Sequence, residues 1–216
     1  MIDSAALLPR VDSDRTRIAG FSTSVHEQVV RVLLPGVGDH DCVRPWSQLA
    51  LAAGLELEGT LRWSELLRAL PRNETDALRE AGGRCDPLLA AVLVDALTVA
   101  TGTPQRCTYM LWPGFAGELD GVSVTAPKDQ GEELGRNEGL VLHDDALAWL
   151  RTRAENGLSH FPVYLWPQDQ AFLVACPIYH DSLYVSGSAT LAGNLKRTGL
   201  DVVDVTRDMV LPSEGD

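Results

Sequence analysis

Hydrophobic residues at helical spacing dominate the first part of the chain. Ser24 and Glu27 have the spacing of a capping box, and an apolar run follows them as far as Pro35 and Gly36. Residues three or four positions apart share one face of a helix, so this pattern predicts a helix over residues 24–34. Its apolar stripe consists of Val25, Val29, Val30, Leu33 and Leu34.

Three further helices are predicted before residue 104, each with a recognisable end. The segment 44–54 stops at Gly54, and the segment 60–71 places Trp63 and several leucines on one face before Pro71. The segment 86–102 has the strongest signals, because Asp86 can cap the helix and Pro87 suits its first position.

After residue 104 the apolar pattern changes to the short runs of β-strands, rich in β-branched and aromatic residues and bounded by turn formers. The predicted strands cover residues 106–112, 121–127, 138–143, 161–166, 171–179, 182–187 and 200–206. Two helices are predicted among them, over 144–155 and 188–198. Helices followed by strands indicate an α+β fold with a mainly antiparallel sheet.

This order divides the chain into an N-terminal arm at 1–20, a helical part of about four helices at 21–104 and a β-rich part at 105–210. With 216 residues and 45% hydrophobic content, the chain is long enough to bury a full core. We expect the two larger parts to pack as one compact unit.

The charge of the chain bears on its partners. The formal net charge is −12 at pH 7, which opposes the counterion release that drives nucleic-acid binding. We therefore expect no nucleic-acid partner, whereas a protein with a basic surface fits better. No signal peptide and no apolar run of membrane-spanning length is visible, so we expect a cytoplasmic protein without a membrane partner.

Cysteine and lysine usage adds two hints about the setting of the protein. The four cysteines are widely spread without a C-x-x-C pair, which predicts reduced, mostly buried thiols. Only Lys128 and Lys196 are lysines among the 18 basic residues, as is typical of a GC-rich genome. No metal site and no cofactor are predicted.

Two short repeats contain tryptophan. Trp46-Ser47-Gln48-Leu49 recurs as Trp63-Ser64-Glu65-Leu66, a faint likeness to a helix-turn-helix, but Glu56 and Glu58 occupy the would-be DNA-reading segment. Two helices that pack their tryptophans into a core explain this repeat better. Trp112-Pro113 and Trp166-Pro167 each close a predicted strand. These two tryptophans can line a ligand groove or fill the core, and core packing is the commoner use of aromatic residues.

Three of the five histidines precede an aspartate, at His40-Asp41, His143-Asp144 and His180-Asp181. Such pairs suit a divalent metal that activates water, but their predicted places are strand ends and turns, not the helices of metal-dependent phosphohydrolases. Asp144 is better explained as the N-cap of the following helix. Asp181 suits a turn, where its carboxylate can bond the backbone two residues on.

Other motifs for catalysis are absent from the chain. Ser188 stands at a strand-to-helix turn that can hold an anion, although capping the helix that starts at Ala189 is the simpler function for it. A glycine-rich segment carries four carboxylates that suit either a solvated loop or a docking surface for a basic partner. These residues are Asp129, Glu132, Glu133 and Glu138.

The segment LWPQDQAFLVACPIYHDSLYVSGS, residues 165–188, resembles an uncharacterised family of soluble proteins from GC-rich Gram-positive bacteria. The family pattern is W-P-x-D-x-A-aromatic-x-V-A followed by D-S-x-Y-V-x-G-S, and TPQRCTYMLWPGFAG and RPWSQLALAAG resemble its other blocks. The chain departs from the pattern at Phe172, usually Trp, and at His180, usually acidic or polar. The resemblance implies no activity and no roles for the matching residues, which are Asp169, Asp181, Ser182, Tyr184, Gly187 and Ser188.

Two functions remain open from the sequence. The first is a non-enzymatic interaction protein, of immunity or regulatory type, whose acidic surface meets a basic partner. The alternative is a small-ligand-binding protein or hydrolase-like enzyme with a pocket between Trp112 and Trp166. In that pocket Asp169, Asp181 or His143 are the candidate acid, base or metal ligand, while Trp112, Trp166, Tyr184 and Ser188 are the candidate ligand-binding residues.

Overall fold

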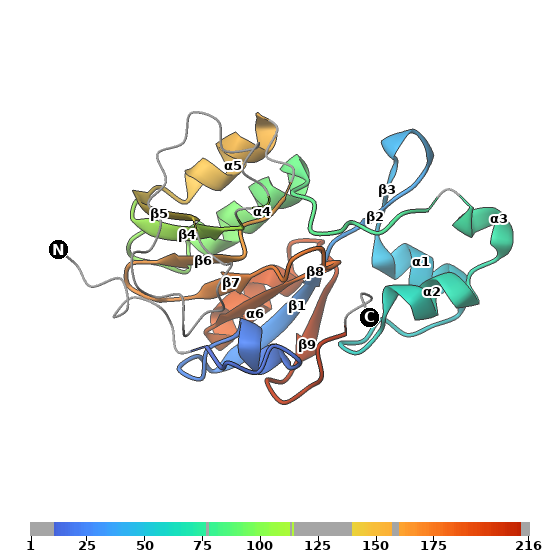
Figure 1. Ribbon diagram of the computed structural model, residues 1–216, viewed down its shortest axis with the longest axis horizontal. Helices are drawn as coiled ribbons and strands as arrows, with labels where there is room; N and C mark the ends of the chain where they lie inside the picture. Colours follow the sequence, from blue (N-terminus) through green and yellow to red (C-terminus); the bar gives the residue numbers. More distant parts are fainter. Residues whose placement is uncertain (1–10, 77, 113, 115–139, 157–159, 213–216) are drawn as a thin grey trace.

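The computed structural model describes residues 11–76, 78–112, 114, 140–156 and 160–212. Its main element is a seven-stranded antiparallel sheet in the order β5-β4-β6-β7-β8-β1-β9 (Figure 1). The strands are β1 (Gln28–Leu33), β4 (Cys107–Leu111), β5 (Leu140–Asp145), β6 (Tyr164–Pro167), β7 (Leu173–Ala175), β8 (Ser182–Gly187) and β9 (Val202–Val205). The fold is therefore α+β with an antiparallel sheet, as the sequence predicts.

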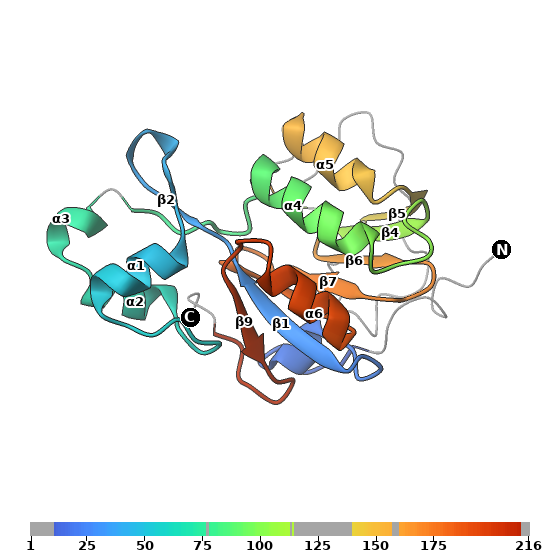
Figure 2. The same cartoon turned by 180° about the vertical axis from the view of Figure 1, so that it is seen from behind.

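Three helices cover one face of this sheet: α4 (Pro87–Thr98), α5 (Ala148–Glu155) and α6 (Ala189–Lys196) (Figure 2). Alternate strand residues, among them Val30, Val32 and Val185, pack against these helices in the largest core cluster. The opposite face is covered by the N-terminal segment with its 3-10 turn η2 (Ile18–Phe21) and by Leu211. The strands β4, β6, β7 and β8 are thus buried on both faces.

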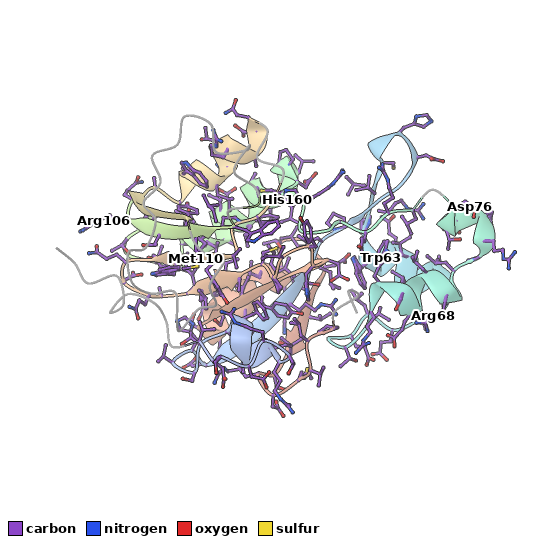
Figure 3. All side chains as sticks on the ribbon, in the orientation of Figure 1. Trp63, Arg68, Asp76, Arg106, Met110 and His160 are labelled. Atoms are coloured by element: carbon purple, nitrogen blue, oxygen red, sulfur yellow. The ribbon has the colours of Figure 1, made fainter. Side chains whose placement is uncertain are left out.

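A smaller lobe stands beside the sheet (Figures 1 and 2). It contains α1 (Trp46–Ala53), α2 (Trp63–Ala69), α3 (Arg72–Thr75), the 3-10 turn η3 (Asp39–Asp41) and the short pair β2 (Gly36–Val37) and β3 (Val43–Arg44). Trp46 and Trp63 meet in its core with ring centroids 5.2 Å apart. Figure 3 shows Trp63 on the side of the lobe that faces the sheet.

Helix ends follow the predicted signals closely. Gly54 ends α1 in the left-handed conformation with φ of 68°, where a side chain would be strained. The Asp86 carboxylate accepts hydrogen bonds from the amides of Leu88 and Leu89 and so caps α4. That helix ends at Thr98, four residues before the predicted Gly102.

The predicted helix over 24–34 is wrong, since residues 28–33 form β1. This strand lies between β8 and β9, with Val30 opposite both Val185 and Asp204. The run over 29–34, which is apolar except for Arg31, fits a strand buried on both faces as well as it fits a helix. Because β1 pairs with β8 and β9, the part at 21–104 and the part at 105–210 share one sheet.

Asp144 does not cap a helix, which corrects the prediction for that residue. It belongs to β5, and the N-cap position of α5 is occupied by Leu147. The predicted strand at 121–127 lies outside the described residues.

Candidate functional site

Asp169 is the first of the candidate carboxylates, and it holds a turn together. It lies in the β6–β7 connection and accepts hydrogen bonds from the Thr101 hydroxyl and the amides of Gly102 and Ala171. Burial alone would raise the pKa of this carboxyl, but these hydrogen bonds outweigh burial and lower the pKa. Both oxygens are thus engaged within the protein.

Asp181 forms a buried ion pair and not the predicted turn bond to the backbone two residues on. Its Oδ1 lies 3.0 Å from an Nη of Arg31, and the exposed fractions of the two side chains are 3% and 0%. The Ser182 hydroxyl donates to the same oxygen at 2.6 Å. The other oxygen of Asp181 is buried without a hydrogen-bond partner in the described part of the chain.

Arg31 joins the sheet to the lobe, and we call this region the junction. Its Nε donates to the Ser182 hydroxyl, and one Nη donates to the carbonyl oxygens of Gly59 and Leu61 in the lobe. The guanidinium also lies 5.4 Å from the ring centroid of Trp46. Every nitrogen of Arg31 therefore has a partner, as a buried guanidinium requires.

The two carboxylates do not belong to one site. Asp169 lies in the connection that enters β7, whereas Asp181 lies in the connection that leaves it. In an antiparallel sheet such connections lie at opposite ends of the strand. The pairing of β7 with β8 confirms that the turn before Ser182 bends a hairpin.

The two strand-ending tryptophans are also separated. Trp166 pairs with Thr108, and Met110 pairs with Tyr164, so this second pair lies between Trp166 and Trp112 on the same face. Four strand residues span about 13 Å at about 3.3 Å each. Trp166 is buried, while Trp112 packs edge-on against Tyr179 at a centroid distance of 5.5 Å.

The remaining candidate residues are spread over three elements. Tyr184 is buried, and burial raises the pKa of its hydroxyl. The Ser188 hydroxyl accepts a hydrogen bond from the Leu191 amide, which confirms it as the N-cap of α6. His143 belongs to β5, of which only the backbone is described. Among the predicted pocket residues whose side chains are described, the structure thus gathers no set around one cavity.

The cysteine thiols and possible metal ligands are the remaining chemical groups. Cys85, Cys107 and Cys176 are buried and Cys42 is exposed, all as free thiols. Burial raises the pKa of Cys176 to about 12, and the nearby Asp181 charge adds to the effect. Within the described ranges no group of three or more His, Cys, Asp or Glu side chains could hold a metal ion.

A shallow groove on the lobe is the best candidate for an interaction site. Its volume is about 580 Å³, and its apolar lining residues are Leu55, Leu61 and Ala69, of which Leu61 is buried. Three carboxylates but only one guanidinium line it, from Glu56, Glu58, Glu65 and Arg68. Arg68 lies at the lower edge of the lobe in Figure 3.

The charges of this groove are held in place to different degrees. The Glu65 carboxylate accepts from the Arg62 amide at the start of α2, and that of Glu58 accepts from the Thr60 hydroxyl. Arg68 donates to the Ser64 hydroxyl. Glu56 is exposed and makes no hydrogen bond or ion pair with the described residues, so its whole charge faces solvent.

The sequence singled out Glu56 and Glu58 only as evidence against DNA binding. The segment between α1 and α2 mixes apolar and acidic residues, and this mixture is the sequence feature that could have indicated a docking groove. The acidic segment with Asp129, Glu132, Glu133 and Glu138, for which the sequence left a solvated loop and a docking surface open, lies outside the described residues. No described helix is long and apolar enough to cross a bilayer.

Comparison with known proteins gives no relative, since no family model, curated protein or solved structure matches the chain. The resemblance of residues 165–188 to a family therefore stays a prediction.

Proposed function

We propose that this protein works by binding another protein that presents a basic surface, in an immunity or regulatory type of pairing. The groove on the lobe carries this proposal. It combines apolar lining residues with an excess of carboxylates, and such a surface is complementary to a segment with both lysine or arginine and apolar side chains.

The anchoring of the lobe supports this function. Arg31 of β1 donates to the lobe carbonyl of Leu61. In the other direction, the Trp46 indole donates to the Leu34 carbonyl that follows β1, and the Ser47 amide donates to the Asp201 carboxylate that precedes β9. A docking surface held by buried contacts loses less conformational entropy on binding than a flexible one.

The charge of the chain supports it as well. A net charge of −12 accelerates the encounter with a basic partner and disfavours acidic competitors. Rim charges are screened by salt, so complex formation of this kind weakens as ionic strength rises.

The test compares one charge reversal in the groove with the same reversal elsewhere. The tagged protein is used to capture partners from a lysate of its source organism over a salt series, and the affinity of the identified partner is then measured. Glu56→Lys is expected to lower that affinity about fivefold, the effect of roughly 1 kcal/mol at a rim charge. Glu155→Lys, at an exposed position at the end of α5, should leave it unchanged.

Two results would contradict the proposal. A partner that stays bound in high salt, or that binds Glu56→Lys as tightly as the unchanged protein, does not use this groove. The alternative function, binding of a small ligand, is not supported at Trp112 and Trp166, which do not line a common pocket in the described part of the chain. A different cleft, at the start of β1, is better suited to a small ligand.

A further inference from the structure

A second cleft lies where β1 begins and β9 ends, away from the lobe groove. Its volume is about 350 Å³, near the lower end of roughly 300–1,000 Å³ for small-molecule sites. Val29 and Val205 form a buried apolar part of its wall. The other lining residues are Thr23, His26, Glu27, Gln28, Asp204, Thr206 and Arg207.

A hydrogen bond to the buried hydroxyl of Ser22 orients the Arg207 side chain. Its Nε donates to Ser22 Oγ at 3.3 Å, and the fully buried Ser22 in turn donates to the Ile18 carbonyl at 2.8 Å. The two terminal nitrogens of Arg207 have no hydrogen-bond partner in the described chain. A guanidinium held by Nε with both terminal nitrogens available can bind a carboxylate through two parallel hydrogen bonds.

Glu27 supplies the opposite charge. Its Oε2 accepts from the Ala189 amide at 3.2 Å, which leaves Oε1 without a partner in the described chain. The other acid of the cleft, Asp204, forms an ion pair with the Lys196 ammonium 2.5 Å away. One unpaired negative charge and one unpaired positive charge therefore face the cleft.

These two charges do not satisfy each other. Glu27 and Arg207 line the same cleft, but no ion pair joins them in the described structure. Opposite charges that share a cleft without contact are complementary to a molecule that carries both charges itself. A simple anion is less suitable, because it would be repelled by a protein of net charge −12.

His26 shapes this cleft and does not supply a free acid or base. Its Nε2 donates to the Gln170 carbonyl at 2.8 Å, and its Nδ1 lies 3.3 Å from the Ser186 hydroxyl. With both nitrogens engaged, the ring orientation is fixed. The geometry therefore favours binding of a ligand over catalysis at this cleft.

We propose that this cleft binds a small zwitterion, of the amino-acid class, with its carboxylate on Arg207 and its ammonium on Glu27. The valines contact its apolar part. This site is separate from the lobe groove and does not depend on the protein partner proposed above.

The test uses the full chain and free amino acids as probes. Each protein amino acid is added at millimolar concentration, beside its N-acetyl derivative, which lacks the ammonium, and its carboxamide, which lacks the carboxylate. At least one free amino acid should raise the melting temperature, and its two derivatives should not. Absence of any shift, or equal shifts with a derivative, overturns the proposal.

Variants locate the site. Arg207→Gln and Glu27→Gln should each weaken binding of the responding amino acid at least about tenfold, the loss of roughly 1.4 kcal/mol. Arg197→Gln is the matched control, because Arg197 is exposed and bonds the Asn194 side chain on the same helix. Equal weakening by the control overturns the assignment.

A measurement on the unchanged protein guards against a variant that fails to fold. In a titration with the same amino acid, the NMR signals of the Arg207 Nε–H and the His26 ring should shift more than those of the lobe. Shifts confined to residues of another region would place the ligand elsewhere and overturn the proposal.

Discussion

Two arginines, Arg31 at the junction and Arg207 in the cleft, show how one side chain can serve stability or binding. Arg31 is fully buried, and each of its nitrogens donates to a carbonyl, hydroxyl or carboxylate of the protein. Arg207 is half-buried and has one nitrogen engaged, by Ser22. The number of donors that the fold already uses separates an arginine that holds the structure from one that can hold a ligand.

The location of the two residues makes the contrast sharper. Arg31 lies within β1, opposite Val203 of β9, and Arg207 follows the end of β9 by two residues. The same strand pair therefore carries a closed polar cluster along its length and an open one at its end. Four substitutions test this distinction, and the largest effect is expected at the junction.

Arg31→Met should destabilise the protein by about 3–5 kcal/mol, because it leaves the Asp181 carboxylate buried without its cation. The free energy of unfolding in urea measures this loss. The double variant Arg31→Met/Asp181→Leu removes both charges and should lose clearly less than the single variant. If the double variant is the less stable of the two, the ion pair is not what the junction depends on.

Gly59→Ala should destabilise the protein by roughly 1–3 kcal/mol. A Cβ at Gly59 would lie 2.6 Å from the Asp204 carbonyl oxygen, so the lobe would have to move from β9. Gly193→Ala on α6 is the control, since its nearest atom is 3.5 Å away, and it should stabilise by about 0.5–1 kcal/mol. The urea midpoint should fall in Gly59→Ala and rise in Gly193→Ala. An unchanged midpoint in Gly59→Ala would mean that the lobe accommodates the added Cβ without loss of stability.

His180 beside the junction predicts a pH dependence smaller than these losses. Burial lowers its pKa, Asp181 opposes that shift and Arg31 adds to it. Because the folded pKa is below the unfolded value of about 6.5, its contribution to stability is present above that value and is lost as pH falls through the folded pKa. In a pH series of urea midpoints, His180→Gln should lose less stability on the acidic side than the unchanged protein. Parallel curves contradict this assignment.

Arg207→Gln should have the smallest effect on folding, within about 0.5 kcal/mol, because it removes one hydrogen bond of a half-buried side chain. Its effect on amino-acid binding should be large, as argued above. A melting temperature that falls as far as that of Arg31→Met would show that Arg207 too is a structural residue.

Local signals predicted the elements that depend on local causes. Gly54, Asp86 and Ser188 end or cap α1, α4 and α6 through bonds to residues a few positions away, so their sequence neighbourhood is sufficient. The cap predicted at Asp144 is one exception, and the segment 28–33 is another. In the sequence, Arg31 fits the polar face of an amphipathic helix. In the structure, Asp181 and the lobe carbonyls, which are far along the chain, allow this charge to be buried within a strand.

The sites were less predictable than the fold for the same reason. Glu27 and Arg207 are far apart in the chain and line the same cleft because β1 pairs with β9. Asp169 and Asp181 are near in sequence, yet β7 separates them. No spacing rule within a single sequence reports either arrangement.

The position of β1 between two strands that are made much later also affects folding during synthesis. About 150 residues are translated between β1 (Gln28–Leu33) and β8 (Ser182–Gly187), which takes roughly 7–30 s at about 5–20 residues per second. Throughout that time an apolar strand has neither of its neighbours, and such a strand invites aggregation. The positive charge of Arg31 in its middle opposes self-association of nascent chains until the carboxylate of Asp181 emerges to bury it.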